Sequence, residues 1–269
     1  MAENLEAKNQ GQYASVNGLQ LYYELHGLAS ANTTPLVLLH GGVGGIAMFG
    51  PNLAVLAQAR RVIAVELQGH GRTVDIDRPM RYELMAEDIA ALLSQLKLHT
   101  ADVMGYSLGA GVALQLVFRH PELARRLVVV SRPIKRSGFY PEVIAAFDKM
   151  GPETGAVMRH SPLATMYPRV NWPTLFAKIG EMERQNYDWS ADVARINSPT
   201  MLVFADADAV TPAHIVEIWS LLGGGKRDAG LDGSGRPPGR LAIVPGTTHY
   251  DLLNTDAVAR LVVPFLDQH

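Results

Sequence analysis

Short apolar runs of strand length alternate with helix-length segments along most of this chain. A connection between two parallel strands must cross the sheet, and the usual crossover is a helix. The alternation therefore predicts an α/β fold, in which a mostly parallel central sheet is flanked by helices. At 269 residues the chain is long enough to bury the core that such a fold needs. The apolar runs are residues 35–40, 61–67, 102–106, 126–131, 199–205 and 240–246.

The beginning of the chain has a different pattern. Residues 13–26 contain two β-rich arms on either side of Asn17 and Gly18. Both of these residues tolerate the positive φ angles that a two-residue hairpin turn requires. We therefore expect an antiparallel hairpin ahead of the parallel strands.

Two segments interrupt the alternation. Residues 132–198 lack the strand–helix rhythm but are rich in aromatic side chains, and we expect a mostly helical lid there. This divides the chain into a core of residues 1–131 and 199–269 and an inserted lid. Residues 223–239 are rich in glycine, proline and charge, a composition that does not form a buried core. We expect them to be an exposed, mobile loop.

The composition excludes several classes of function. Lysine and arginine number 24 against 26 acidic residues, so the formal charge of −2 creates no field that would attract a nucleic acid. There is no cysteine, which excludes disulfides, thiolate metal sites and a cysteine nucleophile. The histidines form no H-E-x-x-H pattern of the kind that binds zinc. We expect neither a metal nor a cofactor.

The N-terminal residues 1–12 are polar and lack the basic and apolar regions of a secretory signal peptide. No uninterrupted apolar run approaches the roughly 20 residues that span a bilayer. We therefore expect a cytoplasmic protein without membrane contacts. The oligomeric state is not indicated by any pattern in the sequence.

A G-x-S-x-G pattern at residues 105–109 centres on Ser107. An apolar strand precedes it and an amphipathic helix follows it, which is the context of a nucleophile elbow. In such an elbow the turn is so tight that side chains at Gly105 and Gly109 would collide with their neighbours, and the serine oxygen is lifted above the sheet edge. The same pattern also occurs in ordinary surface turns, so the assignment depends on finding partners for the serine.

A serine hydroxyl becomes a good nucleophile when a neutral imidazole accepts its proton and a carboxylate orients that imidazole. Candidates for both partners follow late apolar runs. His249 comes just after residues 240–246, and two carboxylates, Asp206 and Asp208, follow residues 199–205. The order serine, acid, histidine is the one expected after a nucleophile elbow.

With these residues the chain resembles the α/β-hydrolase superfamily over nearly its whole length, and it looks closest to lidded, single-domain esterase and lactonase-like members. The resemblance implies a catalytic triad of Ser107, Asp208 and His249. In the family the second carboxylate of a D-x-D-x-x-x-P pattern is commonly the acid, and here that residue is Asp208, four before Pro212. Asp206 stays open as an alternative acid.

Some family members carry the acid earlier, just after the strand predicted at residues 126–130. Ser131 and Arg132 occupy that position here, which favours Asp208. Arg132 also belongs to a basic group with Lys135 and Arg136. These three side chains would either attract an anionic substrate or form a solvated face.

The segment HGGVGG, residues 40–45, is similar to the family's oxyanion loop. The resemblance implies that the backbone N–H of Gly42, with Val43 as the alternative, stabilises the oxyanion together with the N–H of Leu108. Leu108 begins the helix after the serine, where the helix dipole favours negative charge. Residues 66–73 resemble a neighbouring family segment, except that Glu66 and Gln68 replace its usual acid and arginine.

These features predict a serine hydrolase that cleaves carboxylic esters or lactones through an acyl-enzyme. The expected partner is a small-molecule substrate, and the aromatic and methionine side chains of the lid suggest that its acyl part is apolar. Perhydrolysis, C–C bond hydrolysis and thioester cleavage use the same triad and remain alternatives.

Two alternatives come from other classes of protein. Residues 42–47 spell G-x-G-x-x-A after a strand, and Glu66 follows roughly 20 residues later, as in the fingerprint of an NAD(P)-dependent Rossmann oxidoreductase. That interpretation leaves Ser107, Asp208 and His249 without a role. The other alternative is a non-catalytic ligand receptor, because a fold does not by itself entail activity.

Overall fold

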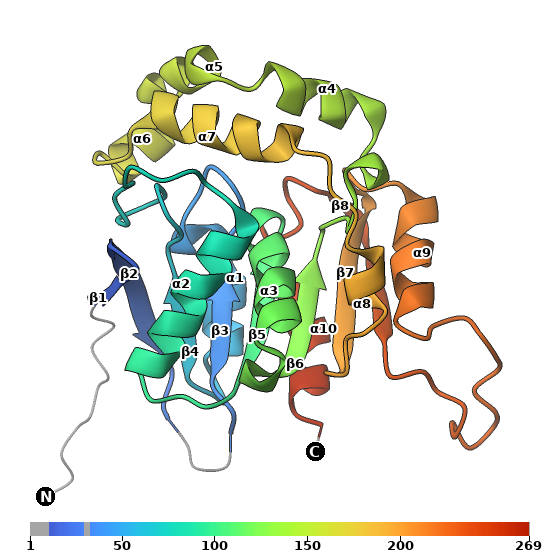
Figure 1. Cartoon of the computed structure of the whole chain (residues 1–269). Coiled ribbons are helices and arrows are strands. Elements are labelled where there is room, and N and C mark those ends of the chain that lie inside the picture. Colours follow the sequence, from blue (N-terminus) through green and yellow to red (C-terminus); the bar gives the residue numbers. More distant parts are fainter. Residues whose placement is uncertain (1–10, 30–32, 269) are drawn as a thin grey trace, which may run out of the picture.

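A computed structural model describes residues 11–29 and 33–268 of the chain. Its centre is an eight-stranded sheet with the order β1-β2-β4-β3-β5-β6-β7-β8 (Figure 1). The strands are β1 (Gln12–Val16), β2 (Leu19–His26), β3 (Leu36–Leu39), β4 (Val62–Val65), β5 (Ala101–Tyr106), β6 (Ala124–Val130), β7 (Thr200–Ala207) and β8 (Arg240–Thr248).

The pairing confirms the predicted mostly parallel sheet. Strands β3 to β8 are parallel to one another, whereas β1 and β2 form an antiparallel hairpin and β2 pairs antiparallel with β4. The hairpin turns at Asn17 and Gly18, whose φ angles are 47° and 84°. These positive angles are the ones that the sequence predicted for a two-residue turn.

Helices cover both faces of the sheet. Successive residues of a strand point to opposite faces, so Leu36 and Leu38 of β3 pack into one apolar cluster and Val37 and Leu39 into the other. One cluster is closed by α1 and α10, and the other by α2, α3, α8 and α9. The helices of these layers are α1 (Gly50–Leu56), α2 (Tyr82–Gln95), α3 (Leu108–Arg119), α8 (Ser190–Val193), α9 (Pro212–Leu221) and α10 (Ala257–Leu266).

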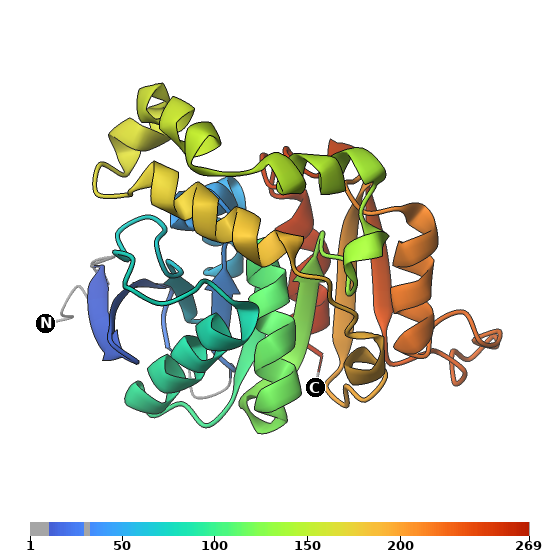
Figure 2. The same ribbon diagram turned by 45° about the horizontal axis from the view of Figure 1, so that its top comes forward.

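The segment from residue 132 to 198 is mostly helical, as the sequence predicted. Its helices α4 to α7 lie over the edge of the sheet at which the parallel strands end (Figures 1 and 2), while α8 packs beside α3 and α9. The remaining helices are α4 (Pro141–Lys149), α5 (Pro152–Val157), α6 (Pro162–Met166) and α7 (Trp172–Arg184), with the 3₁₀ helices η1 (Ile46–Phe49), η2 (Pro121–Leu123), η3 (Arg136–Gly138) and η4 (Met158–His160).

Residues 223–239 contain neither a helix nor a strand and are mostly exposed, in agreement with their composition. Within residues 11–29 and 33–268, no helix combines the length and the apolar character needed to cross a bilayer.

Helix α3 approaches strand β3 more closely than a side chain would allow. A Cβ atom added to Gly109 would lie 2.3 Å from the carbonyl oxygen of Leu39 and 2.4 Å from that of His40. Both obstacles are backbone atoms, which cannot rotate away. Glycine at this position therefore sets how closely the helix packs on the sheet.

We predict that Gly109→Ala lowers the free energy of unfolding by about 1–3 kcal/mol, because the helix must shift away from β3. Gly151→Ala is the matched control, since a Cβ there would meet no atom within 4 Å. The control should change stability by less than about 0.5 kcal/mol. Denaturant unfolding of the two variants measures the difference, and equal stability would contradict the packing argument.

Candidate active site

Ser107 lies in the tight turn between β5 and α3. Its φ of 52° is unusual for a residue with a side chain, and its N–H donates to the carbonyl of Val130 at 2.8 Å. Glycines make the turn possible, because a Cβ on Gly105 would lie 2.2 Å from the carbonyl oxygen of Gly109. This is the strained geometry that the G-x-S-x-G pattern predicts.

His249 lies between the serine and a carboxylate. Its Nε2 is 3.1 Å from Ser107 Oγ, and its Nδ1 is 3.1 Å from Asp208 Oδ1. The backbone of His249 is held by the hydroxyl of Tyr106, which donates to its carbonyl oxygen. The three side chains follow β5, β7 and β8, so parallel pairing brings them to one edge of the sheet.

The Asp208 carboxylate is buried and accepts several hydrogen bonds. Its Oδ2 accepts from the hydroxyl of Ser131 and from the N–H of Ala205 at 2.9 Å, and its Oδ1 accepts from the N–H of Val210 at 3.3 Å. Burial favours the protonated acid, but the hydrogen bonds from His249, Ser131 and Ala205 outweigh it and hold the pKa of Asp208 below its usual value. The carboxylate is therefore charged at neutral pH.

Asp206, the alternative acid, points elsewhere. Its exposed carboxylate accepts hydrogen bonds from the N–H groups of Gly246 at 2.8 Å and Thr247 at 3.1 Å. Of the two candidate carboxylates, the structure brings only Asp208 into hydrogen-bonding distance of His249. Asp206 instead joins the end of β7 to the end of β8.

The segment after β3 lies against the serine turn. A Cβ on Gly41 would be 2.8 Å from the Tyr106 ring and 3.4 Å from the Cβ of Ser107, so this approach also requires glycine. Gly42, Val43 and Leu108 line the same cavity as Ser107. Among the hydrogen bonds of the described residues, none is donated by the N–H of Gly42, Val43 or Leu108. Both candidate donors after β3 are thus near the serine, and Val43 has a φ of 63°.

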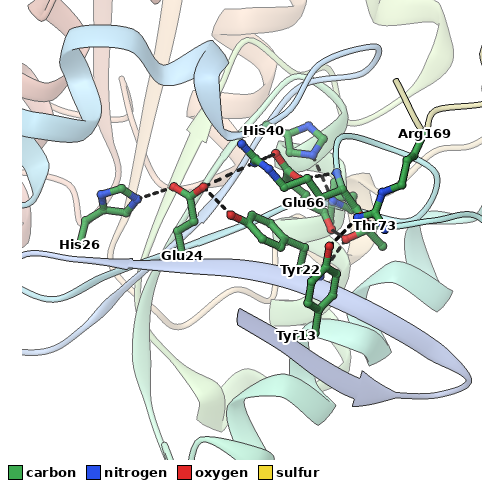
Figure 3. Close-up of polar contacts among 10 residues, drawn as sticks. Tyr13, Tyr22, Glu24, His26, His40, Glu66, Thr73 and Arg169 are labelled. Atoms are coloured by element: carbon green, nitrogen blue, oxygen red, sulfur yellow. Dashed lines mark hydrogen bonds and ion pairs between the residues drawn. The ribbon is translucent and has the colours of Figure 1, made fainter. Parts of the chain in front are cut away.

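Two buried polar side chains next to this segment, His40 and Glu66, are drawn in Figure 3. His40 Nε2 accepts from the N–H of Leu67 at 3.1 Å, and its Nδ1 is 2.7 Å from the carbonyl oxygen of Gly41. Burial lowers the pKa of His40 to about 3, so the ring is neutral near pH 7. His40 therefore positions the segment and does not exchange protons.

Glu66 also lies next to the glycine segment, close to Gly45 (Figure 3). Its fully buried carboxylate accepts from the N–H of Arg72 at 2.5 Å and from Arg72 Nη1 at 2.9 Å. The carboxylate is not accessible to the ribose of a dinucleotide. In addition, the glycine segment is followed by the short helix η1 and not directly by an α-helix. Both observations contradict the Rossmann interpretation of residues 42–47.

The basic group after β6 is not part of the cavity lining. Arg132 is fully buried and paired with Glu183, Lys135 Nζ is 2.6 Å from Glu217, and Arg136 Nη2 is 2.6 Å from Asp148. Each of the three cations therefore has a carboxylate partner. The structure does not support the hypothesis that they attract an anionic substrate to Ser107.

A cavity of about 440 Å³ lies between the serine turn and the helices above it. Ser107 and His249 contribute to its lining, and most of the surface opposite them is apolar. The apolar lining includes Val143 and Phe147 of α4, Met150 directly after it, and Ile179 of α7.

Sequence reasoning identified Ser131 only as the occupant of an alternative acid position. In the structure it is fully buried, has a φ of 52° and donates its hydroxyl to Asp208. The available signal was its place at the end of β6, directly beside β7, which carries Asp208. Its hydroxyl fixes the carboxylate oxygen that does not face His249.

Comparison with known proteins gives a consistent result. The sequence profile described as "Alpha/beta hydrolase family" matches residues 36–261. A protein of Azorhizobium caulinodans described as "Putative carbamate hydrolase RutD" is 28% identical over 225 residues, which cover 76% of this chain and 83% of that protein.

Solved structures share the fold. The enol-lactonase from Burkholderia xenovorans LB400 superposes with a TM-score of 0.74 at 22% identity, over 95% of this chain and 100% of that one. The carboxylesterase CesB from Bacillus subtilis superposes with a TM-score of 0.69 at 22% identity, over 96% of this chain and 91% of that one. At these identities the similarity concerns the fold and not the substrate.

We predict that Asp208→Asn lowers kcat by about 10⁴-fold, because an amide cannot hold His249 in the required tautomer. Asp206→Asn makes the same chemical change in a carboxylate that does not contact His249, and it should retain most of the activity. Steady-state hydrolysis of a nitrophenyl ester distinguishes the two. A larger loss in the Asp206 variant would reassign the acid.

We also predict that Ser131→Gly lowers kcat about tenfold with little change in KM, because Asp208 loses a charge-assisted hydrogen bond. Glycine suits the left-handed backbone at this position, so the variant should still fold, and circular dichroism checks this. An unchanged kcat in a folded variant would show that the Ser131 hydroxyl does not position the acid.

Proposed function

Since this chain belongs to the alpha/beta hydrolase family, we propose that it is a serine hydrolase that cleaves carboxylic esters or lactones through an acyl-enzyme. The observation that supports this most directly is the position of His249, whose two ring nitrogens lie 3.1 Å from Ser107 Oγ and from Asp208 Oδ1. A hydrogen-bonded series of hydroxyl, imidazole and carboxylate activates a serine as a nucleophile.

In the proposed mechanism, His249 Nε2 takes the proton of Ser107 while Oγ attacks the substrate carbonyl. Asp208 accepts a hydrogen bond from Nδ1–H, which orients the ring and stabilises the imidazolium that forms. The imidazolium then protonates the leaving alcohol, and an ester between Ser107 and the acyl group remains. Water attacks this ester with His249 again as the base, and the carboxylic acid and free serine are released.

Negative charge develops on the carbonyl oxygen during both attacks. We assign its stabilisation to the backbone N–H groups of Gly42 and Leu108, with Val43 as the alternative to Gly42. The first N–H groups of a helix have no partner within it, so the N–H of Leu108 at the start of α3 can donate to the oxyanion. Each such donor typically lowers the barrier by about 3 kcal/mol.

We also propose that residues 132–198 act as a lid on a core of residues 1–131 and 199–269. The support for this is the position of α4 to α7 over the strand ends that carry Ser107 and His249. The lid helices contribute Val143, Phe147 and Ile179 to the apolar lining of the cavity, and this lining favours a substrate with an apolar acyl group. A volume of about 440 Å³ is within the range of roughly 300–1,000 Å³ typical of small-molecule sites.

A carbamate is a second candidate substrate, because the relative from Azorhizobium caulinodans is named as a carbamate hydrolase and aligns with 76% of this chain. Its carbonyl would be attacked by the same serine. Perhydrolysis, thioester cleavage and C–C bond hydrolysis also use this set of side chains. The cytoplasmic location expected from the N-terminal sequence stays a prediction.

We predict that the protein hydrolyses nitrophenyl esters and that Ser107→Ala lowers kcat by about 10⁴-fold or more while the fold is retained. Nitrophenyl esters of increasing acyl length, a set of lactones and a nitrophenyl carbamate are assayed side by side. The length at which kcat/KM falls measures the apolar part of the cavity. Circular dichroism of the variant verifies that it is folded.

Ester cleavage that persists at the parent rate in a folded Ser107→Ala variant would contradict the proposal. Preferential cleavage of the carbamate, dependent on Ser107, would move the assignment to the second candidate substrate.

A further inference from the structure

The charged side chains in the lining of the cavity are both acidic. They are Glu142, in the first turn of α4, and Glu183, near the end of α7. Among the described residues, no lysine or arginine contributes to this lining. A substrate bound against Ser107 therefore meets carboxylates and not cations on the lid side.

The negative charge of Glu183 is already neutralised by an ion pair. Arg132 Nη1 is 2.9 Å from Glu183 Oε1, and the hydroxyl of Tyr82 donates to the same oxygen. Glu183 is 3% exposed and Arg132 is 1% exposed, so the pair is removed from water. Arg132 is also enclosed by the rings of Phe139 and Tyr187 and does not reach the cavity lining. This pair contributes little net charge to the site.

The negative charge of Glu142 is not neutralised in this way. It is exposed, and within residues 11–29 and 33–268 its carboxylate forms neither a hydrogen bond nor an ion pair. Because an exposed residue of a cavity lining lies where the cavity opens, Glu142 marks the entrance. Glu142 thus combines a place in the cavity lining with contact to solvent.

The backbone around Glu142 is attached to the loop that carries the acid. The N–H of Tyr140 donates to the carbonyl of Ala209 at 3.2 Å, and the N–H of Thr211 donates to the carbonyl of Gly138 at 2.9 Å. Phe139 and Val210 also form a bridge between the two segments. The start of α4, which carries Glu142, is therefore held next to the loop of Asp208.

We propose that Glu142 selects substrates by charge, so that the enzyme prefers esters that are neutral or carry an ammonium group over esters that carry a carboxylate. This inference rests on the proposed function, and it adds the charge class of the substrate. The physical basis is the Coulomb interaction of a fixed carboxylate with a charge on the substrate at the cavity entrance. An interaction of this kind near a protein surface changes binding about tenfold and weakens as salt is added.

The test uses three nitrophenyl esters of equal acyl length, with a terminal methyl, trimethylammonium or carboxylate group. We expect kcat/KM of the ammonium ester to exceed that of the carboxylate ester by about tenfold or more at low ionic strength. Addition of salt to about 1 M should reduce this ratio severalfold, because charges are then screened over a few ångströms.

Variants assign the effect to one side chain. Glu142→Gln should bring the ratio of the two charged esters close to one, and Glu142→Lys should reverse it. The matched control is Glu153→Gln, which removes an exposed glutamate of α5 that does not line the cavity. The control should leave the ratio as it is in the parent protein.

The possible results separate this inference from the proposed function. Equal rates for the charged esters, or a ratio that Glu142→Gln does not alter, would overturn charge selection; if cleavage still required Ser107, the proposed function would stand. Failure of the parent protein to cleave even the neutral ester would overturn the proposed function, and the inference with it.

Discussion

The close approach of helix α3 to the sheet is the constraint on which the rest of the site depends. Gly105 and Gly109 allow backbone to pack against backbone on both sides of Ser107, and the serine accepts a strained φ of 52° as a result. This single turn sets the height of the hydroxyl above the strand ends and the position of the helix start. The segment after β3 and His249 approach the hydroxyl of Ser107, whose position this turn has set.

The position of Asp208, the proposed acid, depends on several strands together. Asp208 lies beyond the end of β7, but its carboxylate is held by the hydroxyl of Ser131 after β6 and by the N–H of Ala205 within β7. His249, after β8, completes the set. Because three adjacent strands share in the arrangement, the parallel order of the sheet contributes directly to the geometry of the proposed active site.

Much of this arrangement could be predicted from the sequence, because it depends on local signals. The hairpin followed from Asn17 and Gly18, and the proximity of Ser107 to His249 followed from where each lies relative to its strand. The resemblance to the family's D-x-D-x-x-x-P pattern favoured Asp208, but it left Asp206 open as an alternative. Pairing of β7 with β8 is irregular between residues 205 and 207, so simple alternation does not tell which way each carboxylate points.

The burial of Arg132 could not be predicted either, because its charge is neutralised by Glu183, which lies 51 residues later in α7. This ion pair has a mechanical consequence. Lifting the end of α7 from the sheet would carry Glu183 away and leave Arg132 as an unmatched buried charge, which costs several kcal/mol. Helix α4, by contrast, contains no fully buried side chain. Because α4 is held mainly by backbone hydrogen bonds at its start, moving its later turns away from the cavity costs less free energy than moving α7.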